Sequence, residues 1–249
     1  MAGEGLENQL VFTLRHWCFW QSVHGPGTRG WPNGEILPFN QGNADVGFLP
    51  AMQRRRLSPL ARAACAVAWR SHTEHGDMPS VFFSVHGESQ YYFEMLEGMA
   101  NAEPVSPSRF SQCVHNAIAG LSSVHSASYL PYVALAGGTE GLFSAFLEAS
   151  GSLLEAPQVL LVCYDQALPE IYRSYLPDCR STWALGMTLA RAGEVGHQLR
   201  LTREPATDYR ALSVADQGLP NMVQAIIAGQ RRGSSRESGA IWHWRLDDV

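Results

Sequence analysis

A serine, a histidine and a carboxylate fall within five positions of one another in the stretch Ser84-Val-His86-Gly-Glu88. These side chains are the nucleophile, general base and orienting acid of many acyl-transfer enzymes. Working triads, however, are assembled between distant segments, and the chain lacks the Gly-x-Ser-x-Gly motif that places a serine on a strained turn. We therefore interpret the stretch as a strand entering a capped helix. A thioesterase or acyltransferase using Ser84, His86 and Glu88 is kept as an alternative.

Two further patterns could bind a phosphate group or a metal ion, but each lacks a feature that such a site needs. The run from Gly25 to Gly30 fits Gly-x-Gly-x-x-Gly, but Pro26 lacks an N–H group and turn residues follow where a phosphate-binding helix should begin. His72 and His75 stand three positions apart near a predicted helix end, without a third ligand at zinc spacing. We expect neither a cofactor nor a metal site.

A glycine turn has the architecture of a nucleophile elbow. The apolar segment Tyr132–Ala136 predicts a short buried strand, Gly137 and Gly138 break it, and a helix is expected from Thr139 to about residue 150. A nucleophile on such a turn would be activated by the helix N-terminus, whose N–H groups could also hold an oxyanion. Neither serine nor cysteine occupies the tip, and Thr139 fits a helix cap better.

Short apolar strands alternate with helices along the chain, which predicts an α/β fold with a mixed, mostly buried sheet flanked by helices. The predicted strands are 9–14, 81–85, 132–136, 159–164, 184–190, 197–204 (at an edge) and 241–246 (at an edge or an interface). The predicted helices are 58–71, 90–99, 106–121, 139–150 and 220–228, with loops at 24–50 and 231–239.

Composition narrows the class of protein. The 249 residues include 45% apolar side chains and carry a formal charge of −5, and all 18 basic residues are arginine. The missing lysine excludes Schiff-base chemistry, and the acidic balance disfavours nucleic-acid binding. No apolar run reaches membrane-spanning length, so we expect no membrane insertion. Five scattered cysteines are typical of free thiols in a reducing compartment, which predicts a cytoplasmic protein.

Several of these segments together resemble β-ketoacyl synthases, a family with the thiolase fold. The matching segments are 84–89, the motif from Ser106-Pro107-Ser-Arg-Phe through Val114-His-Asn to Ser123, the strand and turn from Tyr132, and Val159–Asp165. Within the family they are most similar to short chain length factor-type proteins of bacterial aryl polyene biosynthesis. The resemblance covers about residues 8 to 190. It implies a ketosynthase-like N-terminal half domain at 1–204, with a C-terminal helix and tail at 205–249 packing on it or on a partner.

The resemblance also implies that the catalytic cysteine of active members falls on Gly138, or on Gly137 if the alignment slips by one. Glycine has no side chain to acylate. The two catalytic histidines of the family belong to a C-terminal half-repeat, for which we expect this chain to be too short. The resemblance thus predicts no catalytic residues and a subunit that is silent in condensation.

Ketosynthases dimerise through the strand before the elbow, and the loop before the asparagine-containing helix, which falls on Ser106–Phe110 here, reaches toward the partner's acyl tunnel. The resemblance therefore assigns tunnel and interface roles to Ser108, Arg109, Phe110, His115, Asn116, Tyr132, Val133, Ala134, Leu135 and Ala136. From the residues alone, two alternatives stay open: Phe110 as an ordinary core aromatic, and Arg109 as a solvated surface charge.

These observations predict a chain length factor that forms a heterodimer with a full-length, cysteine-bearing ketosynthase and shapes its acyl tunnel. Aryl polyene or fatty acid-like biosynthesis is the implied pathway, and an acyl carrier protein is the implied partner of the complex. A homodimeric protein that shelters an acyl chain is a further alternative.

Overall fold

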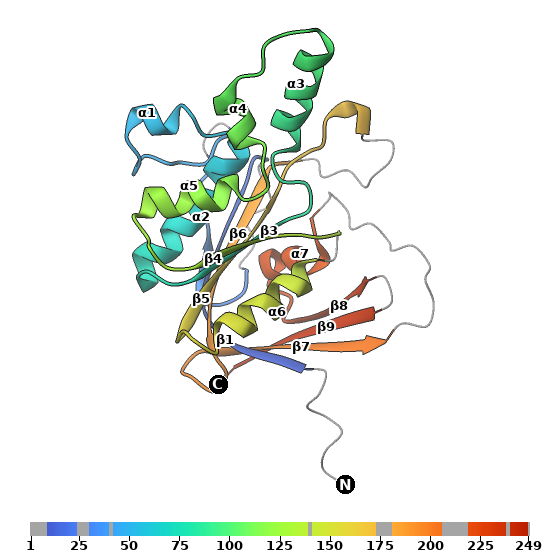
Figure 1. The fold of residues 1–249 in the computed structure, drawn as a ribbon. Helices are drawn as coiled ribbons and strands as arrows, with labels where there is room; N and C mark the ends of the chain where they lie inside the picture. Colours follow the sequence, from blue (N-terminus) through green and yellow to red (C-terminus); the bar gives the residue numbers. More distant parts are fainter. Residues whose placement is uncertain are drawn as a thin grey trace.

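The chain folds around a single curved β-sheet with helices on both faces (Figure 1). The computed structural model describes residues 9–23, 30–39, 42–138, 141–172, 181–205, 219–237 and 240–248. Its strands are β1 (Gln9–Gln21), β2 (Gly34–Ile36), β3 (Ser80–Ser84), β4 (Tyr132–Ala136), β5 (Gln158–Asp165), β6 (Trp183–Arg191), β7 (His197–Pro205), β8 (Arg232–Glu237) and β9 (Ala240–Asp247). Its helices are α1 (Ala51–Arg54), α2 (Pro59–His75), α3 (Ser89–Ala100), α4 (Pro107–Gln112), α5 (Ala117–Ser126), α6 (Leu142–Ser152) and α7 (Asn221–Ala228), with a 3₁₀ turn at Glu170–Tyr172. The predicted glycine motif at 25–30, the helix start at Thr139 and Cys179 lie wholly or partly outside the described residues.

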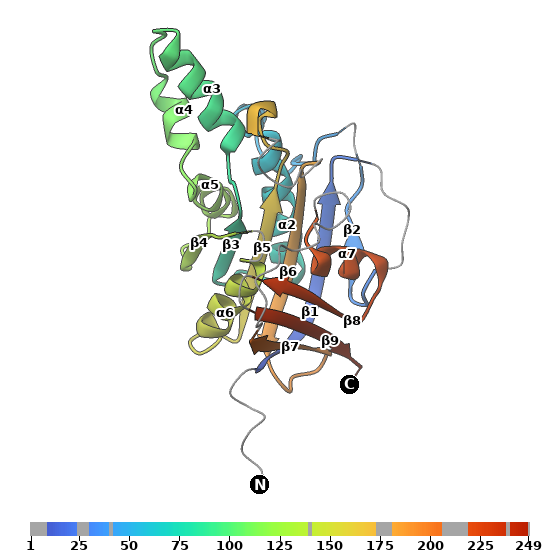
Figure 2. The ribbon, with the colours of Figure 1, turned by 90° about the vertical axis from the view of Figure 1, so that its right-hand side faces the viewer.

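The strands follow the order β4-β3-β5-β6-β1-β7-β9-β8, and β2 pairs with β1 off this path. Strand β3 runs parallel to β4 and β5, whereas β6 is antiparallel to both β5 and β1. The register of β1 against β6 shifts between Leu14 and His16. Before this irregularity β1 pairs with β7, and after it β1 pairs with β2. The irregularity thus lies where β1 passes from one part of the sheet to the other (Figure 2).

Helix α2 packs on one face of the sheet through small side chains. Ser58 caps its start by accepting a hydrogen bond from the Ala61 N–H at 2.8 Å, and Pro59 occupies the first turn. Buried alanines let the helix approach the sheet closely. At Gly186 of β6 an added Cβ would lie 3.2 Å from Val67 and Cys18, so a larger residue there would require these neighbours to shift by a few tenths of an ångström.

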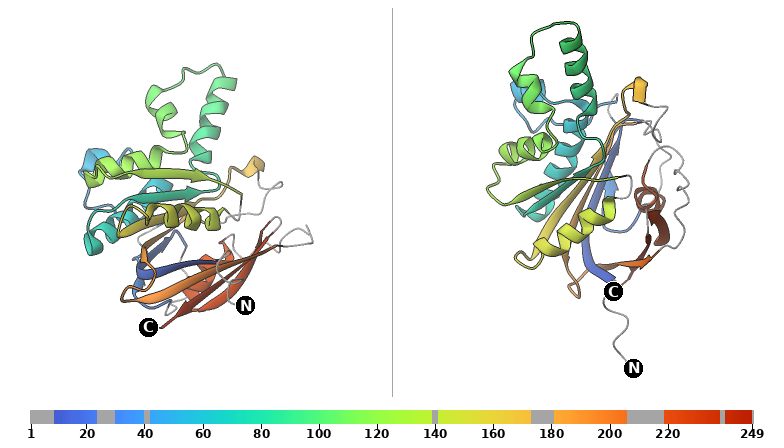
Figure 3. Two further views of the ribbon diagram at one scale, coloured as in Figure 1. Left: turned by 60° about the horizontal axis from the view of Figure 1, so that its bottom comes forward. Right: turned by 45° about the vertical axis from the view of Figure 1, so that its right-hand side comes forward.

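The opposite face holds the larger core. The sheet curves, and helices α6 and α7 lie inside the curve, between its central strands and strands β7, β9 and β8 (Figure 3). Phe143 of α6 stacks on Trp242 of β9 with ring centroids 4.8 Å apart, and Phe146 contacts Phe12 of β1 at 5.7 Å. The C-terminal strands are therefore part of the same core as the first strand.

Several expectations about the elements were wrong because tertiary contacts decided the outcome. The segment 241–246, expected at an edge, is β9 between β7 and β8, and the loop expected over 24–50 contains β2. The helix expected over 106–121 is two helices, broken at residues 113–116. Strand β4 is half exposed because it lies at the sheet edge, and β7 is not an edge strand because β9 pairs with it. The expected polar loop at 231–239 contains β8, which forms a hairpin with β9. There Gly233 lies against Trp244, leaving no room for a Cβ.

We predict that Phe146→Ala lowers the free energy of unfolding by about 3–5 kcal/mol, because it opens a cavity in a fully buried site. The neighbouring Leu147 is 60% exposed, so Leu147→Ala on the same helix should change it by no more than about 0.5 kcal/mol. Urea unfolding followed by circular dichroism measures both. Equal effects of the two substitutions would contradict the packing described for α6.

Candidate functional site

The elbow after β4 has room for a side chain at one glycine. The Gly141 N–H donates to the Gly138 carbonyl at 2.8 Å, and Gly141 stands at the N-terminus of α6. A Cβ on Gly137 would lie 3.1 Å from the Gly141 Cα, whereas a Cβ on Gly138 would meet nothing within 4 Å. Of these two described glycines, position 138 is the one with room for a nucleophile, and the chain has no side chain there.

The described cysteines do not supply a nucleophile elsewhere. Burial raises the pKa of Cys18 and of Cys65 to about 12, and it also raises the pKa of Cys163 and of Cys113. Reactive cysteines need a lowered pKa, because the thiolate is the attacking species. Within the described ranges, no cluster of three or more histidine, cysteine or acidic side chains is arranged to hold a metal ion.

Ser84, His86 and Glu88 do not form a triad. The Ser84 Oγ donates to the Asp165 carboxylate at 2.8 Å and accepts from the Gly87 N–H at 2.7 Å. Glu88 accepts a hydrogen bond from the Ser58 hydroxyl instead. The serine is bound to the Asp165 carboxylate rather than to the His86 imidazole, so the Ser84–His86–Glu88 triad is not assembled.

Helices α3 and α4 form an arm, residues 89–112, that projects beyond the end of the sheet (Figure 2). Neither helix has a buried residue. Large apolar side chains nevertheless line the arm and are 37–57% exposed: Tyr92, Leu96, Met99, Val105 and Phe110. Exposed apolar side chains in this number are typical of a surface that contacts another molecule.

The arm presents Phe110 and holds Arg109. Phe110 is 57% exposed, so the alternative of a core aromatic is wrong. The Arg109 guanidinium forms an ion pair with Glu94 at 2.6 Å and lies over the Tyr91 ring at 4.6 Å. Arg109 therefore braces α4 against α3, rather than pointing freely into solvent. Ser108 is exposed beside them.

The junction between α4 and α5 is tied to β4. The His115 Nε2 lies 2.7 Å from the Leu135 carbonyl, and because a carbonyl only accepts, Nε2 carries the proton. This bond lies within the break in the expected long helix, at residues 113–116. Asn116 stands exposed at the start of α5 without a side-chain capping bond.

The structure brings the residues predicted for the interface to one side of the molecule. Figure 2 shows α3, α4, α5 and β4 on the same side. Strand β4 pairs with β3 on one edge, and the described residues pair no strand with its other edge. Its five residues are uncharged and half-buried or exposed: Tyr132, Val133, Ala134, Leu135 and Ala136.

A cluster of arginines lies beside the C-terminal end of the arm, at Gln112. Arg54, Arg55, Arg56 and Arg62 form no ion pair with the described residues, and no acidic residue occurs between Asp45 and Glu74. Arg62 donates to the Arg54 carbonyl at 2.7 Å, and Gln112 of the arm donates to the Arg56 carbonyl at 3.1 Å. A protein of net charge −5 thus concentrates positive charge here.

Asp165 is a residue of the site that the sequence analysis missed. Its side chain is buried at the carboxyl end of β5 and accepts hydrogen bonds from Ser84, Val85 and His86. Burial raises the pKa of Asp165, and the hydrogen bonds act against this rise. The sequence signal that could have identified Asp165 was an acidic residue at the end of an otherwise apolar strand.

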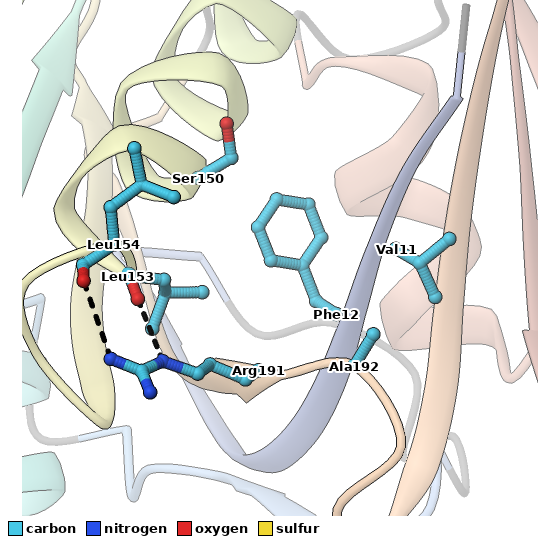
Figure 4. Close-up of a pocket in the computed structure, with 7 residues that line it drawn as sticks. All are labelled: Val11, Phe12, Ser150, Leu153, Leu154, Arg191 and Ala192. Atoms are coloured by element: carbon cyan, nitrogen blue, oxygen red, sulfur yellow. Dashed lines mark hydrogen bonds between the residues drawn. The ribbon is translucent and has the colours of Figure 1, made fainter. Parts of the chain in front are cut away.

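A surface hollow of about 410 Å³ lies at the other end of α6 from the elbow (Figure 4). Its lining residues are Val11, Phe12, Ser150, Leu153, Leu154, Arg191 and Ala192. The Arg191 guanidinium donates to the Leu153 and Leu154 carbonyls, at 2.8 Å and 3.4 Å, and so caps the end of the helix. This hollow is separate from the elbow and from the interface residues.

Comparisons with known proteins agree on the fold. The family model for beta-ketoacyl synthase, N-terminal domain, matches residues 28–245. A chain of the ketosynthase ApeO in complex with its chain length factor ApeC, from Xenorhabdus doucetiae, is 20% identical with a TM-score of 0.75, over 95% of this chain and 99% of that one. The ishigamide ketosynthase/chain length factor is 12% identical with a TM-score of 0.55, over 83% and 90%.

A third structure is a type II PKS acyl-carrier protein in complex with its ketosynthase bound to the hexaketide. It is 8% identical with a TM-score of 0.63, over 97% of this chain and 100% of that chain. No curated protein matches the sequence. The described helices include none that is long and apolar enough to cross a membrane.

We predict that Glu88→Gln makes the protein more stable above pH 7. Burial raises the pKa of Glu88 from 4.5 to about 7, so the folded state keeps a proton that the unfolded chain releases between these values. The contribution of Glu88 to stability is therefore present below pH 4.5 and is lost as the pH rises through 7. The loss is about 3 kcal/mol at 1.36 kcal/mol per pKa unit.

Urea unfolding between pH 5 and pH 8 tests this expectation. The difference in unfolding free energy between the native chain and the variant should grow across this range. Glu155→Gln, at an exposed position, is the control and should show a difference that does not vary with pH. A flat difference for Glu88→Gln would contradict the burial of a titrating carboxyl group.

Proposed function

This chain belongs to the β-ketoacyl synthase family, and we propose that it is a non-catalytic subunit of the chain length factor type. It forms a heterodimer with a cysteine-bearing ketosynthase and shapes the acyl tunnel of that partner. The observation that carries the proposal is Gly138, the elbow position with room for a side chain and none present. Without a nucleophile there, no acyl thioester forms on this subunit.

The two edges of the sheet support an interface at β4. Exposed strand edges invite pairing with other chains, and proteins usually protect them with charged side chains. Strand β8 has Arg232 and Arg236 at the other edge, whereas β4 has no charged residue. An unprotected apolar edge next to an exposed apolar arm fits a surface that is covered in a complex.

We assign the wall of the partner's tunnel to helix α4 of the arm. Phe110 is exposed and Arg109 is held by Glu94 and Tyr91, so α4 presents an aromatic ring on a braced helix. A packed aromatic wall rejects additional methylene groups sterically. Ser108, His115 and Asn116 are the neighbouring candidates on the same segment. Aryl polyene or fatty acid-like biosynthesis is the pathway that we propose.

An acyl carrier protein is the partner that we propose for the assembled complex. Arg54, Arg55 and Arg56 give this subunit an unpaired positive surface beside the arm. Complementary charge mainly accelerates the encounter of two proteins and selects the partner. We do not assign a thioesterase activity, because Ser84 is fully buried and is bound to Asp165 rather than to His86.

We predict that the tagged chain, purified from its native host, is recovered in a one-to-one complex with a larger ketosynthase. Native mass spectrometry gives the mass and composition. Ala136→Asp places a charge on the exposed edge of β4 and should reduce recovery of the ketosynthase at least tenfold. The matched control Ser234→Asp, on the opposite edge strand, should leave recovery unchanged. A homo-oligomer free of ketosynthase would overturn the proposal in favour of an acyl-binding homodimer.

We predict that Phe110→Ala shifts the products of the complex toward longer chains, by at least one two-carbon unit, because it removes an aromatic wall. Phe110→Trp should shift them toward shorter chains. Val195→Ala, at a position 85% exposed on the turn between β6 and β7, is the control and should leave the distribution unchanged. Mass spectrometry of extracted products measures the lengths. Identical distributions for intact native and Phe110 complexes would refute the assignment of the wall.

A further inference from the structure

The arm is attached to the body at three places. At its root, the loop 84–88 leads from β3 into α3. Along α3, the Phe93 ring meets the Tyr172 ring edge-on, with centroids 5.8 Å apart. At its end, Gln112 donates to the Arg56 carbonyl. Because no residue of α3 or α4 is buried, these attachments rather than core packing set the direction of the arm.

The root is the most extensively bonded of the three attachments, and Asp165 is its centre. One carboxylate oxygen accepts from the Ser84 hydroxyl at 2.8 Å and from the His86 N–H at 3.1 Å, and the other accepts from the Val85 N–H at 2.9 Å. The Ser84 Oγ in turn accepts from the Gly87 N–H. A single buried carboxylate thus fixes four consecutive residues immediately before the arm.

The conformation of this loop leaves little freedom. Gly87 has φ +53°, and an added Cβ there would lie 3.0 Å from the His115 Nδ1. Glu88, the next residue, is 5% exposed and is bonded to Ser58 at the start of α2. The root is therefore held by β5 through Asp165 and by α2 through Ser58.

We infer that Asp165 is a positioning residue that sets the direction of the arm, and through it the length of chain that the complex accepts. The effect on chain length rests on the proposed function, whereas the effect on the direction of the arm does not. Arg109, the residue before Phe110, contacts Tyr91 and Glu94 in the first two turns of α3, so Phe110 lies near the root of the arm and moves with it. By fixing the root, Asp165 can therefore control what Phe110 excludes.

Asp165→Asn tests the inference, because it keeps the shape of the side chain but turns an NH₂ group toward at least one N–H or O–H donor. Spin labels at Ser108→Cys on the arm and Glu155→Cys on the body report the arm position, with Cys113 and Cys179 replaced by serine. We expect the distance distribution to become at least twofold broader, and the complex to give a broader distribution of product lengths. Ser84→Ala removes one of the three bonds to Asp165, together with the bond from the Gly87 N–H, and should broaden both distributions less because the Val85 and His86 bonds remain.

Asp45→Asn is the matched control, because the Asp45 carboxylate also accepts a backbone hydrogen bond, from the Gly47 N–H at 2.8 Å, but in a loop of the body. It should leave both distributions unchanged. Amide exchange of β5 and β6 confirms that each variant is folded, and Ser84→Ala carries the test if Asp165→Asn does not fold. An unchanged distance distribution in the folded variants would overturn the inference. A broadened arm with unchanged product lengths would support Asp165 as the anchor and count against the tunnel wall in the proposed function.

Discussion

Strand β5 is buried on both faces and paired on both edges, and the other elements are arranged around it. It pairs in parallel with β3 and antiparallel with β6, and seven of its eight residues are buried. Helices α2 and α6 contact it from opposite sides. Its last residue, Asp165, binds the loop that starts the arm. The same strand thus organises both cores and the direction of the exposed α3–α4 hairpin.

The elbow and the exposed apolar surface are separate features of this structure. The elbow is formed, with a glycine turn leading into the N-terminus of α6, but it has no nucleophile. The side chains that distinguish the chain are instead on the surface, along the arm and the edge strand β4. The role that we propose depends on shape and contact, since packing and sterics act without a reactive group.

Much of the fold was predictable from local signals. Ser58-Pro59 correctly marked the start of α2, and the apolar run at 159–164 predicted β5 within one residue at each end. The helix at 220–228 was also confirmed. These signals work because capping, turn chemistry and hydrophobic periodicity act over a few neighbouring residues. The glycine turn at 137–138 was visible for the same reason.

The sequence alone showed glycines at the elbow in place of a serine or cysteine, the lack of lysine, and a motif shared with ketosynthases. Only the tertiary structure decided where these residues lie. The exposure of β4 depends on its place at the end of the strand order, and the break at 113–116 coincides with the bond from His115 to the Leu135 carbonyl. The role of Asp165 depends on Ser84, which is 81 positions away in the chain. Contacts between such distant residues depend on how the strands pair in the sheet, and local sequence patterns do not predict this pairing.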